Sequence, residues 1–172
     1  ARSTGGAASF VREPVQPVPL RAVPEKPKNA VNLDHPAKLS DPIDILIAED
    51  NEVNQLVFAQ ILDGLGFSYK IAANGRAAVE MYRLLKPKLI LMDVSMPEMN
   101  GYEATHAIRD AEATDGTRTP IIGVTAHALK GDMDKCMEAG MDDYLSKPIS
   151  PNRLGAKIAF WLASATTLSK SA

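Results

Sequence analysis

The sequence has only one cysteine, Cys136, among its 172 residues, and it has no long hydrophobic run. The lone thiol excludes an internal disulfide and is compatible with a reducing cytoplasm. A bilayer-spanning helix needs roughly 18 consecutive apolar residues, and a secretory signal needs a basic segment followed by an apolar core. Neither is present, so we expect this chain to be cytoplasmic, with any membrane anchor lying elsewhere in a parent protein.

The sequence also lacks a large excess of charge of either sign. The 19 Lys and Arg residues nearly balance the 21 Asp and Glu residues, which leaves a formal net charge of −2. Proteins that bind nucleic acids usually collect Lys and Arg on one face, and no such cluster occurs here. The composition therefore disfavours a nucleic-acid partner. The length allows one domain with a sizeable core and an additional segment.

Residues 1–40 lack the apolar periodicity of helices or strands. Seven of the twelve prolines lie at or before Pro42, separated by small and charged residues. Such a segment cannot bury enough apolar surface to offset the entropy lost on ordering. We interpret residues 1–40 as a semi-extended linker. The alternative is an arm that docks on a partner or on the adjoining domain.

From Ile43 onward, short apolar runs alternate with amphipathic segments. Strands are expected at 43–48, 67–72, 88–92, 120–124 and 143–146, and helices at 51–65, 74–86, 101–113, 129–139 and from 150. This alternation predicts an α/β fold, a parallel sheet with helices on both faces. We expect a doubly wound five-stranded sheet in the order 2-1-3-4-5. Residues 41–164 would form this domain, and residues 165–172 a flexible tail.

The third apolar run ends directly in an acid, Asp93. Short apolar runs of this kind are typical of strands buried on both faces, and open α/β sheets bind ligands at the carboxyl ends of their strands. Asp93 could be a nucleophile or base, a metal ligand, or a plain helix cap. Glu49 and Asp50 end the first run, and the expected strand order brings all three carboxylates to one edge.

Three converging carboxylates repel one another unless a positive charge lies among them. A hard divalent cation such as Mg²⁺ prefers oxygen ligands of this type. The alternative is that Glu49 and Asp50 only cap the following helix. Thr125, at the end of the fourth strand, and Lys147, after the fifth, add a hydroxyl and an ammonium group. Either is unremarkable alone, but the ordered set suits a doubly charged phosphoryl group.

These motifs resemble the receiver domain of two-component response regulators. The matching segments are 45–51, 91–101, 124–126 and 144–148. Segments 50–54, 125–128 and 140–144 look most like receivers fused to hybrid histidine kinases. The resemblance implies a flavodoxin-like (βα)5 fold and a phosphoacceptor in a phosphorelay. It also implies that this chain is not a free-standing enzyme and that its parent is a sensor histidine kinase.

The resemblance further implies a role for each acid. Asp93 is expected to be phosphorylated, by taking a phosphoryl group from a phosphohistidine. Mg²⁺ is expected to be held by Asp50 and Asp93 directly, by Glu49 mainly through water, and by the backbone carbonyl of Ser95. Asp93 would therefore serve both the metal and the transferred group.

Other residues are implied to assist transfer and to switch the domain afterwards. Lys147, followed by a cis peptide bond to Pro148, would pair with Asp93 and then with a phosphoryl oxygen. Thr125 would hydrogen-bond the phosphoryl group, and Tyr144 would swing inward behind it. His127 occupies a position that the family uses to tune phosphoryl lifetime.

The implied partners are the phosphohistidine domain of a histidine kinase, a histidine phosphotransfer protein, or both. Partners of this kind dock near the first helix, where Leu56 and Ala59 fall off the main apolar arc. Ser3–Phe10 faintly resembles the closing strand of a kinase ATP-binding domain. Residues 1–40 are therefore expected to begin at the end of such a domain.

Three other interpretations remain open at this point. The first is a stand-alone receiver with an N-terminal extension. The second, a flavodoxin-like nucleotide-binding protein, needs a Ser/Thr/Gly-rich phosphate cradle after the first strand, where this chain has Glu49–Glu52. The third, an Asp-nucleophile hydrolase, needs a second acid two residues after Asp93, where Ser95 stands.

Overall fold

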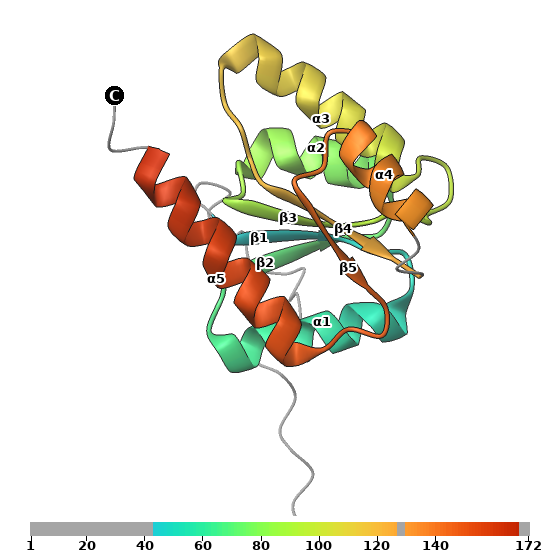
Figure 1. The fold of residues 1–172 in the computed structure, drawn as a ribbon, viewed down its shortest axis with the longest axis vertical. Coiled ribbons are helices and arrows are strands. Elements are labelled where there is room, and N and C mark those ends of the chain that lie inside the picture. Colours follow the sequence, from blue (N-terminus) through green and yellow to red (C-terminus); the bar gives the residue numbers. More distant parts are fainter. Residues whose placement is uncertain (1–42, 127–129, 169–172) are drawn as a thin grey trace, which may run out of the picture. The chain divides into compact units, whose positions relative to one another are not determined.

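The computed structural model describes residues 43–126 and 130–168. Within these ranges five strands alternate with five helices (Figure 1). The strands are β1 Ile45–Ala48, β2 Tyr69–Ala72, β3 Leu89–Asp93, β4 Ile121–Thr125 and β5 Asp143–Ser146. The helices are α1 Glu52–Leu65, α2 Gly75–Leu85, α3 Gly101–Asp115, α4 Lys130–Glu138 and α5 Pro151–Leu168. The strands form one parallel sheet in the order β2-β1-β3-β4-β5, which confirms the predicted topology.

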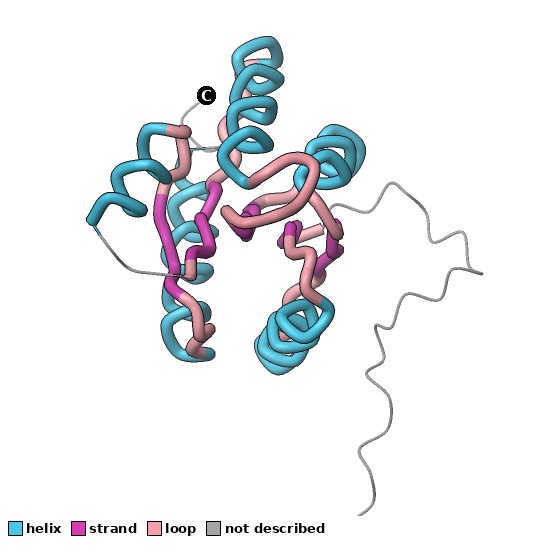
Figure 2. Tube along the Cα trace, turned by 90° about the vertical axis from the view of Figure 1, so that its right-hand side faces the viewer, coloured by secondary structure: helices cyan, strands magenta, loops and turns pink. Residues whose placement is uncertain are grey.

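The sheet is covered on both faces, with α1 and α5 on one side and α2, α3 and α4 on the other (Figure 1). In the perpendicular view the strands lie enclosed by helices (Figure 2). Side chains of β3 alternate between the two faces, as the period of a strand requires. Leu89 and Leu91 pack in the cluster with α1 and α5, whereas Ile90 and Met92 pack in the cluster with α2 and α3. β3 is therefore the buried centre of the sheet.

Local hydrogen bonds explain where two elements begin and end. Helix α1 stops at Gly66, which adopts φ 77°, a left-handed conformation that glycine tolerates well. The next amide, Phe67 N–H, donates back to the Leu62 carbonyl at 3.2 Å. Phe67 therefore completes the helix end, and β2 starts at Tyr69 instead of at the predicted residue 67.

Helix α5 is longer than the sequence pattern suggested. It continues to Leu168, so the first four residues of the expected tail, 165–168, are helical. Residues 1–42, 127–129 and 169–172 lie outside the described ranges, and with them the expected linker and His127. No helix within the described ranges is long and apolar enough to cross a bilayer.

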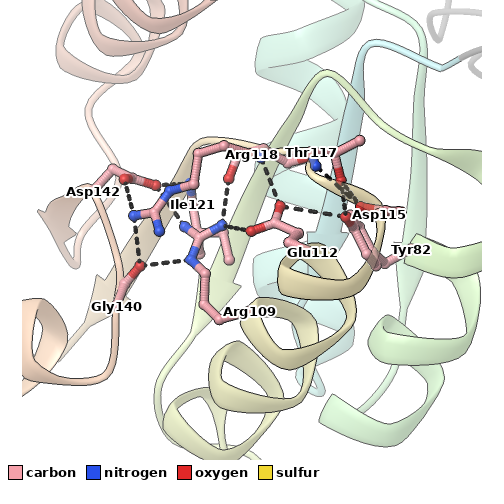
Figure 3. A network of polar contacts seen from close by, with 10 residues as sticks. Tyr82, Arg109, Glu112, Asp115, Thr117, Arg118, Ile121, Gly140 and Asp142 are labelled. Carbon is pink, nitrogen blue, oxygen red and sulfur yellow. Dashed lines mark hydrogen bonds and ion pairs between the residues drawn. The ribbon is translucent and has the colours of Figure 1, made fainter.

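A dense polar network joins α3 to the starts of β4 and β5 (Figure 3). Arg109 donates to the carbonyls of Gly140 and Thr119, each at 2.9 Å. Its guanidinium also pairs with Glu112 at 2.5 Å and with Asp142 at 2.7 Å. Asp142 directly precedes β5, so this network ties down the amino ends of the strands, opposite to the edge where Asp93 lies.

Candidate functional site

The register of the sheet brings the predicted site residues to one edge. Asp93 is the last residue of β3, and it pairs with Val124 of the neighbouring strand. Thr125 is the last residue of β4, and it pairs with Ser146, the last residue of β5. Lys147 follows Ser146 directly. The carboxyl ends of these parallel strands therefore meet at one place, as they do in ligand-binding α/β sheets.

Three carboxylates gather at this edge. Glu49, Asp50 and Asp93 each offer an oxygen, and the three oxygens lie within 4.8 Å of one another. Glu49 is 0% exposed and Asp93 2% exposed, whereas Asp50 is open to solvent. Carboxylate oxygens at this spacing are the donor set that a hard divalent cation prefers. The residues present therefore fit a metal ion that enters from the Asp50 side.

Lys147 supplies a positive charge to the buried acids. Its Nζ lies 2.8 Å from Asp93 Oδ2 and 3.0 Å from Glu49 Oε2. Burial disfavours the charged ammonium, but the neighbouring carboxylates of Asp93 and Glu49 outweigh burial, so the pKa of Lys147 is raised. Its peptide bond to Pro148 is cis, as expected.

The charged form of Asp93 is nevertheless disfavoured despite the nearby ammonium group of Lys147. Burial raises the pKa of the Asp93 carboxyl above its ordinary value, and the neighbouring Glu49 charge adds to the rise. Hydrogen bonds from Lys147 and from the Ser95 N–H, the latter 3.1 Å from Asp93 Oδ1, oppose it. The single ammonium therefore does not fully compensate the acids, which favours the entry of a further cation.

The two residues expected to switch lie on neighbouring strands. Thr125 is 2% exposed at the end of β4, and Tyr144 is half-buried in β5. The Tyr144 ring lies 5.6 Å from Lys157 Nζ of α5, within the range of a cation–π contact. Lys157 also pairs with Asp143 at 2.6 Å, and Trp161 Nε1 donates to the same carboxylate at 3.1 Å. Strand β5 and helix α5 are therefore bonded together beside Tyr144.

Helix α1 has a cap of its own, so the acids are not needed for that task. The side chain of Asn51 accepts hydrogen bonds from the backbone amides of Val53, at 2.9 Å, and Asn54, at 3.2 Å. This observation weighs against the alternative that Glu49 and Asp50 merely cap the helix. Asn54 also bonds to Glu49 through its side chain, a contact that the sequence motifs did not indicate.

Replacement of Lys147 by Met is expected to destabilise the metal-free protein by about 3 kcal/mol, because two buried carboxylates lose their cationic partner. Added Mg²⁺ should restore more stability in this variant than in the unaltered chain, since the ammonium no longer repels it. Urea unfolding in EDTA and in Mg²⁺ measures both effects. Lys130→Met, at an exposed position of α4, is the control. If Mg²⁺ raised the free energy of unfolding equally in Lys147→Met and in the unaltered chain, the expectation would be wrong.

Comparison with known proteins identifies the family of this chain. The family model described as the response regulator receiver domain matches residues 45–159. The chain is 36% identical over 124 residues to the polar-differentiation response regulator DivK of Brucella anthropi, covering 72% of this chain and 99% of DivK. It is 48% identical over 118 residues to hybrid signal transduction histidine kinase I of Dictyostelium discoideum, covering 66% of this chain. It spans only 7% of that kinase.

Solved receiver structures share the fold. The receiver domain of sensor histidine kinase PA1611 from Pseudomonas aeruginosa PAO1, with a magnesium ion in its active-site cleft, has a TM-score of 0.65 and 41% identity. That match covers 72% of this chain and 99% of the other. The Saccharomyces cerevisiae Ssk1 receiver, co-crystallised with the histidine phosphotransfer protein Ypd1, has a TM-score of 0.68 and 35% identity, covering 71% and 90%. The chain belongs to the response regulator receiver domain family.

Proposed function

We propose that this receiver domain is the phosphoacceptor of a two-component phosphorelay, with Asp93 as the residue phosphorylated. The observation that carries the proposal is the environment of Asp93. Its carboxylate ends β3 almost wholly buried, with Lys147 Nζ 2.8 Å away and two more carboxylates converging on it. Such a site holds a negatively charged group only if further positive charge is supplied.

In the proposed reaction an oxygen of Asp93 attacks the phosphorus of a phosphohistidine. The new P–O bond forms as the P–N bond breaks, and the electron pair returns to the imidazole nitrogen. A divalent cation held by Asp50 and Asp93, proposed to be Mg²⁺, would supply positive charge to the phosphoryl oxygens when bound. Lys147 orients the carboxylate and then pairs with the transferred group. Little else is required, because phosphoryl transfer depends mainly on positioning and charge neutralisation.

The proposed metal ligands are Asp50 and Asp93 directly, Glu49 through water, and the Ser95 carbonyl. Burial separates Asp50, which faces solvent, from Glu49 and Asp93, which are both buried. Thr125 is proposed to bond the new phosphoryl group, and Tyr144 to change its position in response. Only a difference in binding between two arrangements of Thr125 and Tyr144 can shift their populations.

The proposed partner in transfer is a histidine phosphotransfer domain that docks over α1. This helix starts just after Asp50, so its first turns border the acidic edge. Val53 and Leu56, one helical turn apart, are 69% and 56% exposed, while Ala59 is only partly exposed. Val53 is therefore added to the pair proposed from sequence, Leu56 and Ala59, as part of the docking surface. The co-crystallised yeast receiver supports a partner of this class.

We propose a hybrid histidine kinase as the parent protein, on the strength of the Dictyostelium kinase and the PA1611 receiver of Pseudomonas aeruginosa. Residues 1–40 would then link the receiver to the kinase. A stand-alone receiver is the second candidate, because the chain covers 99% of DivK. The coding sequence upstream of Ala1 distinguishes the two.

Incubation with acetyl phosphate and Mg²⁺ tests the proposed chemistry. Intact-mass measurement should show one added phosphoryl group per chain, and chelation by EDTA should prevent its addition. Reductive trapping of the acyl phosphate followed by peptide mapping should place it on Asp93. Absence of incorporation, or incorporation elsewhere, would reject the proposal.

A further inference from the structure

The buried acid Glu49 is held by the first turn of α1. Its Oε1 accepts hydrogen bonds from the side-chain amide of Asn54, at 2.9 Å, and from the backbone N–H of Asn51, at 3.2 Å. Its backbone carbonyl accepts a third bond, from Gln55 Nε2 at 2.7 Å. The carboxylate and the main chain of Glu49 are therefore both fixed to the same helix.

The other carboxylate oxygen has a different environment. Glu49 Oε2 is buried and accepts no hydrogen bond of good geometry from the described residues, although Lys147 Nζ lies 3.0 Å away as an ion pair. Oε1 is committed to α1, so Oε2 is the oxygen that lies beside Lys147, whose Nζ also contacts Asp93. One oxygen of Glu49 is thus an anchor and the other is available to the acidic edge.

We propose that Asn54 is a positioning residue for the metal site, which acts by holding Glu49 so that Oε2 is available to a water of the cation. This inference rests on the proposed function, since it assumes that a divalent cation binds among Glu49, Asp50 and Asp93. Outer contacts of this kind orient ligands, and their loss typically lowers metal affinity by about 10- to 100-fold.

A purely structural role explains the Asn54 amide poorly. The cap of α1 is already supplied by Asn51, which accepts the backbone amide of Asn54 itself. Side chains in a helix lean toward its amino end, and this one reaches back five residues to Glu49. The helix would therefore keep its cap without the Asn54 side chain, but the carboxylate would lose one of its two donors.

The test compares Asn54→Leu with Gln60→Leu. Both variants exchange a side-chain amide for an apolar group on α1, but Gln60 is exposed and lies away from Glu49. Isothermal titration calorimetry without any phosphodonor should give a Kd for Mg²⁺ raised about tenfold in Asn54→Leu and unchanged in Gln60→Leu. With acetyl phosphate, Asn54→Leu should need more Mg²⁺ for half-maximal labelling yet approach the normal rate at saturation.

A lowered melting temperature with an unchanged Kd for Mg²⁺ would overturn the proposal, because that result describes a structural residue only. If Asn54→Leu fails to fold, Asn54→Ser carries the same expectation, since serine is tolerated in a first helical turn but is shorter than asparagine. Failure of the proposed function can be distinguished from failure of the Asn54 proposal. A chain that binds Mg²⁺ but is never phosphorylated still reports whether Asn54 sets the affinity.

Discussion

Asp93→Asn is expected to abolish phosphoryl incorporation from acetyl phosphate in the presence of Mg²⁺. The amide has nearly the volume of the carboxylate, so the buried end of β3 stays filled. It is a poor nucleophile toward phosphorus, however, and it removes the anion that Lys147 contacts at 2.8 Å. Labelling should fall below detection, as measured by intact mass over a time course that saturates the unaltered chain.

The matched control is Asp110→Asn, the same chemical change at an exposed position of α3. It should be labelled at the normal rate and to the normal extent. Circular dichroism of both variants should match that of the unaltered chain, which separates lost chemistry from lost folding. Normal labelling of a folded Asp93→Asn variant would mean that another residue is the phosphoacceptor.

Arg109→Leu is expected to lower the free energy of unfolding by about 3–5 kcal/mol, the usual cost of breaking a buried ion pair from one side. The side chain of Arg109 is 13% exposed, and that of its partner Glu112 is 3% exposed. Asp142 keeps its ion pair with Arg118 at 2.6 Å. Glu112 loses Arg109, its only ion-pair partner among the described residues. The carbonyls of Gly140 and Thr119 lose a donor as well.

Urea unfolding monitored by circular dichroism measures this loss. Lys88→Met is the control, because its ion pair with Asp44 involves a lysine side chain that is 56% exposed. Its cost should stay within about 1 kcal/mol. The double variant Arg109→Leu, Glu112→Leu should recover part of the stability, since no unpaired carboxylate is left behind. Equal losses in Arg109→Leu and Lys88→Met would show that the network contributes no more than a surface pair.

Sequence patterns predicted that the candidate site residues would share one edge of the sheet, because those residues stand at the ends of regular elements. Asp93 ends a short apolar run, Thr125 ends the next strand, and Lys147 follows the last strand. Once strand order is inferred from the alternation of elements, these residues must share an edge. The pattern did not reveal how deeply the acids are buried. Nor did it reveal that Lys147 Nζ lies 2.8 Å from Asp93 and 3.0 Å from Glu49, since these contacts depend on side-chain packing.

Contacts between distant segments were not predictable. Arg109 and Glu112 stand three apart on α3, a spacing that indicates an exposed helical pair. Nothing in the sequence signals that Asp142, 33 residues further on, completes a buried network with Arg109. Asn54 was missed for a related reason, because an asparagine in a first helical turn usually suggests capping. Its bond to Glu49 depends on how the loop after β1 folds back.

Strands β4 and β5 carry the Arg109 network at one end and the candidate site at the other. Substitutions at the two ends would therefore impair a cell in different ways. Weakening the network reduces how many chains are intact and escape proteolysis, while each folded copy keeps its candidate site. A change such as Asp93→Asn at the opposite end should leave abundance unchanged but remove the proposed phosphoacceptor from every copy.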